Sequence, residues 1–423
     1  MFIKSETLKN ISTLSVGTVA AQIIPLVFAP VIAKLYSAEQ FGYFAAILAI
    51  VNIFSVVING KYEMSVILPT KEKDSNSIIV GSWGIGAFLS LIIFTLLTLS
   101  SGYIANKFRI DFGIIESLIV SIMLFSIAVW QPLNYFFIRK KSFKEMVFNK
   151  IVKSGSLTLV TILLGYLSWD YFSNGLVIGS LLGWFFLLFY SIYQARKNGF
   201  TWKGLDLETI KSQLIQYKDY PLFNAFPAVL NSIGSQMGVY IFTFYFTGEI
   251  TGYYSFSKQY LFVPLTIVGI SLSQVYFQRI SEKFKAKESI IKELRYLLLF
   301  LFIIGVIVIL VVQLFVVNGF ILIFGNKWEP SAIMAKYLIL YFVIQFIVSP
   351  LSTVLHALKE IKLASIFPFI YVTSMCLLVF APKLSLSSFL PYYVLAEGIP
   401  YLLYLGIIIY AVNKYEKALV KNN

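Results

Sequence analysis

Apolar runs about 20 residues long recur along the whole of this 423-residue chain, and short polar connections separate them. A helix needs a run of about that length to cross the hydrocarbon core of a bilayer. Each run is expected to be a helix, because the alternating apolar and polar pattern of a membrane β-barrel is missing. The mean hydropathy of +0.81 and the charged fraction of 13% are far from those of a soluble domain. The sequence therefore predicts an all-α, polytopic membrane protein.

The distribution of Lys and Arg predicts how the spans are oriented. We place twelve spans at residues 11–35, 41–60, 77–101, 114–138, 146–168, 173–194, 220–246, 252–277, 294–318, 330–356, 362–382 and 388–412. Of the 34 basic residues, 27 fall on the side of the two termini and five on the other side. Cytoplasmic connections carry the excess of basic residues, so both termini are predicted to be cytoplasmic. This topology accounts for the net charge of +14 and argues against a nucleic-acid partner.

A short motif occurs once near the start of the chain and again at its midpoint. The stretches "YSAEQFGYF" and "FTGEITGYYSF" align Glu39 with Glu249 and Gly42 with Gly252, 210 residues apart. Six spans separate the copies, so both would run the same way through the membrane. This favours a parallel duplication into two pseudo-symmetric six-helix lobes, at residues 1–200 and 220–423. A chance likeness between two short polar turns is the alternative.

The segment between the two predicted lobes, residues 201–219, contains a helical pattern. In "GLDLETIKSQLIQYKDY", Leu207, Ile210 and Leu214 share one face of a helix. We expect an amphipathic helix that lies on the inner membrane surface and links the lobes. An ordinary solvated linker is the other interpretation.

Several classes of site are not expected in this chain. Cys376 is the only cysteine and His356 the only histidine, so neither an intrachain disulfide nor a zinc site is expected. No nucleotide-binding motif of the Walker type is present. The predicted outer connections are too short to bring together the several groups that catalysis needs. The sequence therefore predicts a protein that is not an enzyme and has no catalytic residue, metal or cofactor.

Two spans carry a stripe of polar side chains beside prolines. The residues that share a face are Ser15, Thr18 and Gln22 in the first span, and Asn224, Asn231 and Ser235 in the seventh. Unpaired polar groups are costly in hydrocarbon, so each stripe needs a water-filled cavity or a polar partner helix. Because the two spans are equivalent in the predicted repeat, the pair of stripes favours a cavity. For any single residue, interhelical hydrogen bonding is an equal alternative.

Four ionisable residues within or beside spans are candidates for a functional role. Lys258 and Glu397 are each about 10 to 13 Å from the outer ends of the eighth and twelfth spans, at helical rise. They could form a structural salt bridge; alternatively, Lys258 could contact an anionic substrate, or Glu397 could titrate as an ion-coupling group. Lys61 and Glu63, at the inner end of the second span, could line the cytoplasmic mouth or form one interfacial ion pair.

Five stretches resemble the Wzx-like polysaccharide or O-antigen flippases, a branch of the superfamily that also holds multidrug extruders and the lipid II flippase. They are "YSAEQFGYFAAILA", "KYEMSVILPTKEKDS", "YPLFNAFPAVLNSIGSQM", "FTGEITGYYSFSKQYLFVPLTIVGISLSQVYFQRIS" and "FGNKWEPSAIMAKYLILYFVIQFIVSPLS". The resemblance implies two lobes around an alternately opened lumen in the bacterial cytoplasmic membrane. It also implies a polyprenyl-diphosphate-linked oligosaccharide as substrate, with polymerase or assembly proteins as possible partners.

The site residues follow from their positions in this sequence. The expected substrate contacts are Lys258, Gln22, Asn224, Asn231, Gln236 and Lys61, and the expected coupling groups for H+ or Na+ are Glu397 and Glu63. A cationic lining suits a diphosphate. Two other functions stay open: a multidrug or cation antiporter of the same superfamily, and a membrane sugar polymerase.

Overall fold

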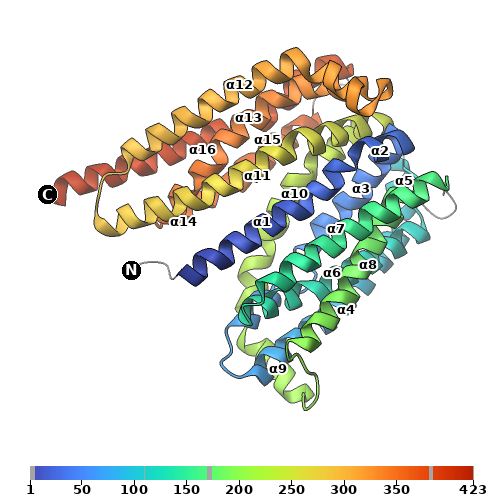
Figure 1. Ribbon diagram of the computed structural model, residues 1–423, viewed down its shortest axis with the longest axis vertical. Helices are drawn as coiled ribbons and strands as arrows, with labels where there is room; N and C mark the ends of the chain where they lie inside the picture. The colour runs from blue at the N-terminus through green and yellow to red at the C-terminus, as the bar shows by residue number, and fades with distance from the viewer. Residues whose placement is uncertain (1–4, 109, 169–173, 381–383, 423) are drawn as a thin grey trace. The chain divides into compact units, whose positions relative to one another are not determined.

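The computed structural model describes residues 5–108, 110–168, 174–380 and 384–422, and every regular element in these ranges is a helix (Figure 1). The first ten α-helices are α1 (Ser5–Val27), α2 (Ala29–Leu35), α3 (Ala38–Ser55), α4 (Glu72–Leu99), α5 (Ser101–Phe108), α6 (Ile114–Arg139), α7 (Phe143–Tyr166), α8 (Gly175–Lys197), α9 (Leu207–Gln216) and α10 (Asp219–Tyr245). The others are α11 (Gly248–Ala286), α12 (Ile291–Phe324), α13 (Glu329–Ala357), α14 (Ile361–Ala364), α15 (Ile366–Leu377) and α16 (Leu386–Asn422). Three 3₁₀ helices are η1 (Tyr62–Ile67), η2 (Asn326–Trp328) and η3 (Leu378–Phe380).

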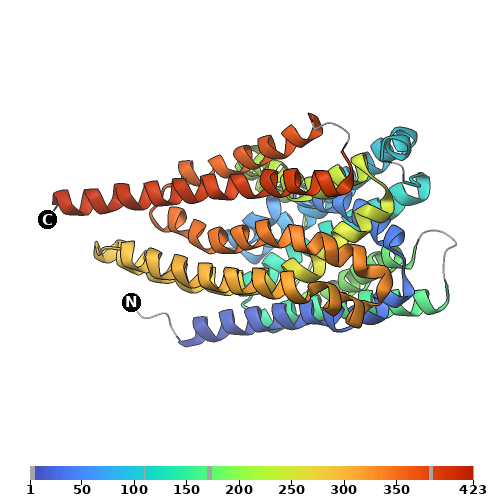
Figure 2. The same cartoon turned by 90° about the horizontal axis from the view of Figure 1, so that it is seen from above.

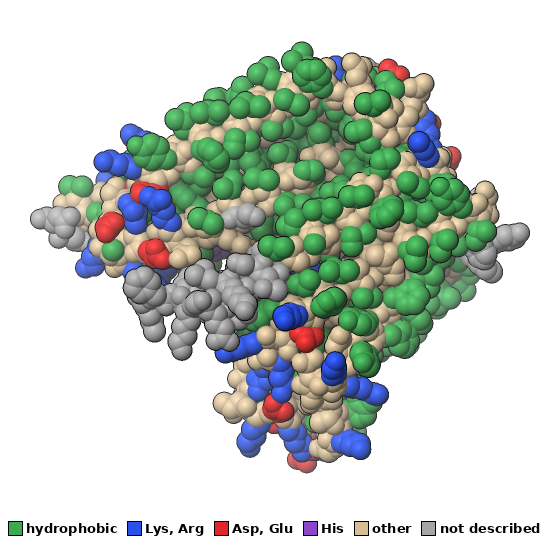
Figure 3. Space-filling view, viewed as in Figure 1, with side chains coloured by type: hydrophobic (Ala, Val, Ile, Leu, Met, Phe, Trp, Pro, Cys, Tyr) green, Lys and Arg blue, Asp and Glu red, His purple; other side chains and the backbone are tan. Residues whose placement is uncertain are grey.

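The helices have the lengths and surfaces of membrane spans. In the described ranges, eleven helical segments are long and apolar enough to cross a bilayer. α10, with 27 residues, matches the predicted span 220–246 but is not among the eleven. In Figure 3, hydrophobic side chains cover the helix flanks, and Lys and Arg gather near α9 and near the α11–α12 connection. The chain is an all-α, multi-pass membrane protein, while a count of twelve spans stays a prediction.

The chain forms two compact units, Met1–Thr251 and Gly252–Asn423. α10 belongs to the first unit because it packs on α3 and α5. One contact is a hydrogen bond of 3.0 Å from the Ser232 hydroxyl to the carbonyl oxygen of Asn52. The boundary between the units therefore follows α10, whereas the predicted second lobe starts at residue 220. The division into two six-helix lobes stays a prediction.

Glycines allow two pairs of helices in unit 1 to pack closely. A Cβ atom at Gly86 of α4 would lie 2.4 Å from the Cβ of Ala128 on α6, and one at Gly179 of α8 would lie 2.1 Å from the Thr161 hydroxyl on α7. These distances are too short for any side chain. By contrast, nothing lies within 4 Å of the same position at Gly84. Small residues at such crossings let helix backbones approach.

The two copies of the repeated motif have similar local structure. Ser37 caps α3, and its hydroxyl accepts a hydrogen bond of 3.2 Å from the backbone N–H of Gln40. At the other copy, the Thr247 hydroxyl accepts a bond of 3.3 Å from the backbone N–H of Ile250. Glu39 and the equivalent Glu249 therefore both lie in the first turn of a helix. A negative charge is favourable there, because the free N–H groups give that end a partial positive charge.

The segment at residues 201–219 contains the helix α9, and its place on the inner membrane surface stays a prediction. Ile210 and Leu214 pack against α4, where a Cβ at Gly81 would lie 3.1 Å from both side chains. Leu207, in contrast, is 84% exposed. Asp206 caps the helix and pairs with Lys73 at 2.9 Å. The hydrogen bond from Lys73 is the main reason that the pKa of Asp206 lies below its usual range.

In unit 2 the long helices pack lengthwise. α13 packs against both α12 and α16, and these helices run side by side in Figures 1 and 2. The core of unit 2 is apolar and aromatic. For example, the rings of Phe256 on α11 and Trp328 on η2 stack with centroids 3.7 Å apart.

Candidate functional site

Glu397 is the centre of a buried polar cluster in unit 2. The side chain, on α16, is 3% exposed. Its Oε1 accepts a hydrogen bond of 2.5 Å from the Tyr393 hydroxyl, and its Oε2 accepts one of 2.8 Å from the Tyr371 hydroxyl on α15. The Tyr393 hydroxyl is also 2.7 Å from the hydroxyl of Tyr254 on α11. Both carboxylate oxygens of Glu397 therefore have phenolic donors.

Lys258 belongs to the same cluster. It lies one turn after Tyr254 on α11, and its Nζ is 5.7 Å from the centroid of the Tyr254 ring. The Lys258 charge acts on Glu397 and interacts with Tyr254. The structure thus brings together the two ionisable residues that the sequence places at matching depth. We name the five residues Glu397, Tyr371, Tyr393, Tyr254 and Lys258 the Glu397 cluster.

The chemistry of the Glu397 cluster suits a proton or a small hard cation. A carboxylate in an apolar region is costly unless it is protonated, paired or bound to a cation. Carboxylate and hydroxyl oxygens are the ligand type that such cations prefer. Among the described residues, no group of three or more His, Cys, Asp or Glu could hold a metal ion.

Lys61 and Glu63 lie at η1, between two candidate spans. Glu63 is 5% exposed, and its Oε2 has no hydrogen-bond partner among the described residues. Burial raises the pKa of Glu63, although its backbone hydrogen bond and the charge of Lys61 partly oppose this shift. The two side chains do not form an ion pair within the described part of the chain, so a direct interfacial pair is the wrong interpretation.

The predicted polar stripes differ in their surroundings. The Ser15 side chain lies outside the described residues. Gln22, Asn224 and Asn231 are exposed, whereas Gln236 is half-buried and donates a hydrogen bond of 3.2 Å to the Ser235 hydroxyl. The substrate contacts of these side chains stay predictions.

The first stripe leads to a site that the sequence analysis missed. The Nζ of Lys150 on α7 donates a hydrogen bond of 2.7 Å to the Thr18 hydroxyl. One turn further along α7, the Nζ of Lys153 lies 3.4 Å from the centroid of the Trp184 ring. Both lysines are half-buried, about 10 and 15 Å from the start of the helix at Phe143. Neither forms an ion pair with a described residue. We name Lys150 and Lys153 the α7 cation pair.

A buried amide beside the α7 cation pair lacks partners. Asn149 is 1% exposed, and neither its Nδ2 nor its Oδ1 has a hydrogen-bond partner among the described residues. α7 and α8 are antiparallel neighbours, with Leu157 against Gly183 and Ser142 hydrogen-bonded to Asn198 at 3.1 Å. In this register Asn149 is opposite Ser191, whose hydroxyl is also buried without a described partner. The unpaired polar atoms of Asn149 and Ser191 thus lie within about one helical turn of the cation pair along α7.

The sequence carried a signal for the α7 cation pair. The positive-inside pattern assigns both lysines to a cytoplasmic connection, because basic residues cluster just before them in the sequence. However, their i, i+3 spacing places them on one face of the apolar helix that follows. An unpaired cation inside a span is a functional signal by default. The position of the two lysines inside a span, rather than the positive-inside pattern, therefore identifies them as a site.

Comparisons with known proteins support a transporter fold. Residues 31–333 match the model of the polysaccharide biosynthesis protein family. A structure of the lipid II flippase MurJ, in an inward closed conformation, is 18% identical, with a TM-score of 0.73 over 95% of this chain and 87% of that chain. No curated protein matches the sequence.

Two further transporter structures have a similar fold. An inward-facing multidrug resistance MATE family transporter of the MOP superfamily is 11% identical, with a TM-score of 0.67 over 96% of this chain and 95% of that one. A MOP superfamily transporter from Pyrococcus furiosus is 13% identical, with a TM-score of 0.63 over 98% of this chain and 99% of that chain. At these identities the likeness shows the fold alone. The family model, in contrast, covers well over half of the sequence, and the chain belongs to the polysaccharide biosynthesis protein family, with the fold of the MOP superfamily transporters.

Proposed function

We propose that the protein is a flippase that carries a polyprenyl-diphosphate-linked oligosaccharide across the bacterial cytoplasmic membrane. The family links the chain to polysaccharide biosynthesis, and the fold is that of transporters, including a lipid II flippase. The proposed cargo is an O-antigen or capsule repeat unit. With both termini in the cytoplasm, two six-helix lobes would open alternately to the two sides. Polymerase and assembly proteins would receive the product.

The physical problem of this transport is the sugar head group. Each hydroxyl costs at least about one or two kcal/mol to strip of water without a new partner, so an oligosaccharide cannot cross the hydrocarbon unaided. A hydrated, polar passage removes this cost, while the prenyl tail stays in the bilayer. The exposed Gln22, Asn224 and Asn231 and the half-buried Gln236 are our proposed sugar contacts.

The α7 cation pair carries the proposal, because it matches the charge of a diphosphate. Two ammonium groups inside a candidate span, without a described carboxylate partner, need an anion to offset the cost of burial. The amide of Asn149 could donate to a phosphate oxygen. Hydrogen bonds between ammonium groups and phosphates are among the strong ones. We add Lys61 and Lys258 as cations on other elements that would contact the anionic substrate.

The Glu397 cluster is our proposed coupling site. A proton or sodium ion that moves down a potential of 100 mV releases about 2.3 kcal/mol. Binding of that ion to Glu397 would neutralise the buried carboxylate and change its bonds to Tyr371 and Tyr393. Glu63, a second buried carboxylate, is a secondary candidate for the same role.

Deletion of the gene from its host, followed by complementation, tests the proposal. The Lys150→Met, Lys153→Met double variant should lower surface polysaccharide at least tenfold and cause lipid-linked oligosaccharide to accumulate. Lys144→Met removes an exposed lysine near the start of the same helix and serves as the control. Membrane levels of all variants are compared by immunoblotting. Full surface polysaccharide in the double variant would remove the α7 cation pair from the account. If deletion changed drug efflux but not polysaccharide, the chain would be a multidrug antiporter instead.

A further inference from the structure

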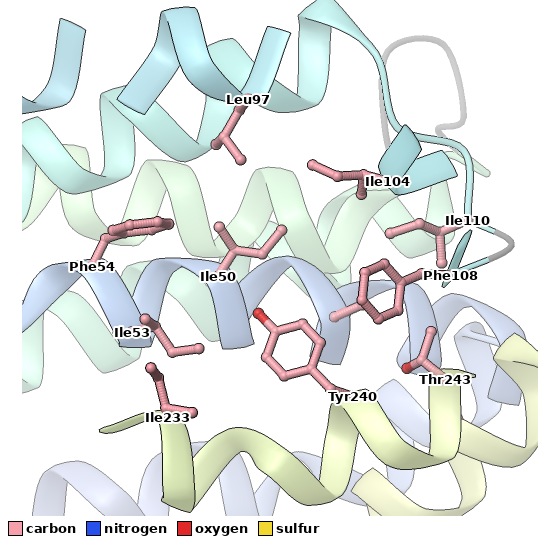
Figure 4. A pocket seen from close by; sticks show the side chains of 11 residues that line it. Ile50, Ile53, Phe54, Leu97, Ile104, Phe108, Ile110, Ile233, Tyr240 and Thr243 are labelled. Atoms are coloured by element: carbon pink, nitrogen blue, oxygen red, sulfur yellow. The ribbon is translucent and has the colours of Figure 1, made fainter. Parts of the chain in front are cut away.

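Unit 1 contains an apolar cavity that none of the proposed site residues lines. Its volume is about 260 Å³, and side chains of α3, α4, α5 and α10 line it (Figure 4). Ile50 and Phe54 of α3, Leu97 of α4, Phe108 of α5 and Tyr240 of α10 all contribute side chains. We name this space the outer cavity, because α5 lies on the side predicted to face outward.

The lining of the outer cavity excludes a sugar as its occupant. Only two lining side chains carry a hydroxyl. The hydroxyl of Thr243 donates a bond of 2.7 Å to the carbonyl oxygen of Val239, in its own helix, which leaves Tyr240. An oligosaccharide would lose its hydrogen bonds to water here without replacement. A hydrocarbon chain loses nothing, and apolar cavities of this kind bind apolar molecules.

A cation lies next to the cavity. Lys107 directly precedes the lining residue Phe108 on α5, and the Phe108 ring is 5.6 Å from that of Tyr240. The Nζ of Lys107 is 4.7 Å from the centroid of the Phe244 ring, one turn further along α10. Lys107 is exposed and is one of only five basic residues predicted on the outer side. An apolar cavity with an adjacent cation is complementary to an anionic lipid.

The short separation between cation and cavity distinguishes two kinds of anionic lipid. In a prenyl diphosphate the hydrocarbon starts at the ester oxygen of the phosphate. In a glycerophospholipid the glycerol and an acyl ester stand between phosphate and chain. Here the Lys107 ammonium lies over the Phe244 ring, one helical turn from the lining residue Tyr240, which fits the prenyl lipid. A group the size of a water molecule, such as one carbon of a chain with its hydrogens, occupies about 30 Å³. The cavity therefore holds about nine such groups, or about two isoprene units.

We propose that the outer cavity binds the first isoprene units of the lipid carrier on the outward side, with Lys107 beside its phosphate. This inference rests on the proposed function and extends it. The cavity would hold the carrier near its diphosphate after the head group has crossed. Its lipid would then be retained until the product is passed on.

Photo-crosslinking tests the site. The probe is farnesyl diphosphate with a benzophenone on its chain, applied to the full chain in lipid nanodiscs. Lys150→Gln and Lys153→Gln are included in every protein, so that the α7 cation pair does not contribute. We expect labelled peptides from α3, α5 and α10, and excess unlabelled farnesyl diphosphate should suppress the labelling. Labelling confined to other helices would overturn the inference.

Four variants, two of them controls, identify the cause of binding. Lys107→Gln should weaken farnesyl diphosphate binding at least tenfold while leaving farnesol binding unchanged, and Lys327→Gln is the control for loss of an outer cation. Ile53→Trp fills the cavity, whereas Leu99→Trp adds the same ring at an exposed position on α4. Only Ile53→Trp should weaken the binding of both ligands. Equal binding in all variants would overturn the inference.

Three further outcomes decide separately on this inference and on the proposed function. If phosphatidylglycerol competed as well as farnesyl diphosphate, the cavity would be a site for ordinary membrane lipid, and the inference would fail. If the protein moved lipid-linked oligosaccharide but bound no prenyl diphosphate at the cavity, only this inference would fail. If it bound prenyl diphosphate but moved no oligosaccharide, the proposed function would fail.

Discussion

At the scale of single residues, the buried glutamates Glu397 and Glu63 differ in their hydrogen bonds. Glu397 has a tyrosine donor at each carboxylate oxygen, whereas Oε2 of Glu63 has no described partner. Donors stabilise an ionised carboxylate, and burial without them destabilises it. The two residues should therefore respond differently when each is replaced by glutamine.

Replacement of Glu397 by glutamine should uncouple transport from its ion gradient. Glutamine keeps the size of the side chain but cannot exchange a proton or attract a cation. We expect the initial rate of transport into proteoliposomes to fall at least tenfold and to become insensitive to a gradient of H+ or Na+. Tyr371→Phe removes one donor and should have a smaller effect. Glu329→Gln changes an exposed glutamate of unit 2 and is the control. A normal ion dependence in Glu397→Gln would exclude the coupling role.

Replacement of Glu63 by glutamine should stabilise the protein at neutral pH. The pKa of Glu63 is raised in the folded state, so the unfolded state releases its proton first as pH rises. Folding stability therefore falls as pH rises from the unfolded pKa to the higher folded pKa. We expect equal melting temperatures for wild type and Glu63→Gln in acid, and a higher one for the variant at neutral pH. Thermal unfolding in detergent measures this, with Glu208→Gln as an exposed control. An unchanged difference across the pH range would contradict the shift.

At the scale of helices, local signals were predictable and contacts between distant segments were not. The apolar spans were found because hydropathy is a local property. α5 was missed because it is an eight-residue helix in a polar connection. The sequence predicted only part of the Glu397 cluster. Lys258 and Glu397 lie at similar depths in their predicted spans, but the three tyrosines in apolar helices gave no signal of their own. The packing of α10 on α3 depends on contacts 180 residues apart, which no local pattern specifies.

The crossing of α4 and α6 should tolerate no side chain at Gly86. A methyl group there would lie 2.4 Å from the Cβ of Ala128, so Gly86→Ala forces the helices apart. Overpacking of this kind costs about 1–3 kcal/mol. The control is Gly84→Ala in the same helix, where nothing lies within 4 Å. Melting in detergent should show a lower midpoint for Gly86→Ala alone. Equal midpoints would mean that the crossing can open without cost.

At the scale of the whole molecule, the predicted topology can be tested by labelling. Cys376 is the only cysteine, so a Cys376→Ser background is free of thiols. A cysteine at Asn106 on α5 should react with a membrane-impermeant maleimide on intact cells. One at Lys203, in the connection before α9, should react only after permeabilisation. Both positions are exposed. The reverse pattern would place the termini outside.

The central claim is that the chain moves a lipid-linked oligosaccharide across a bilayer, and a flipping assay with purified protein tests it most directly. A fluorescent polyprenyl-diphosphate oligosaccharide is incorporated into proteoliposomes. An external reductant then quenches only the fluorophores in the outer leaflet of the vesicle membrane. We predict that, under an imposed ion gradient, wild-type protein makes almost all of the fluorescence accessible. The Lys150→Met, Lys153→Met variant should be at least tenfold slower. If wild-type vesicles kept the same protected fraction as protein-free vesicles, the proposed function would be contradicted.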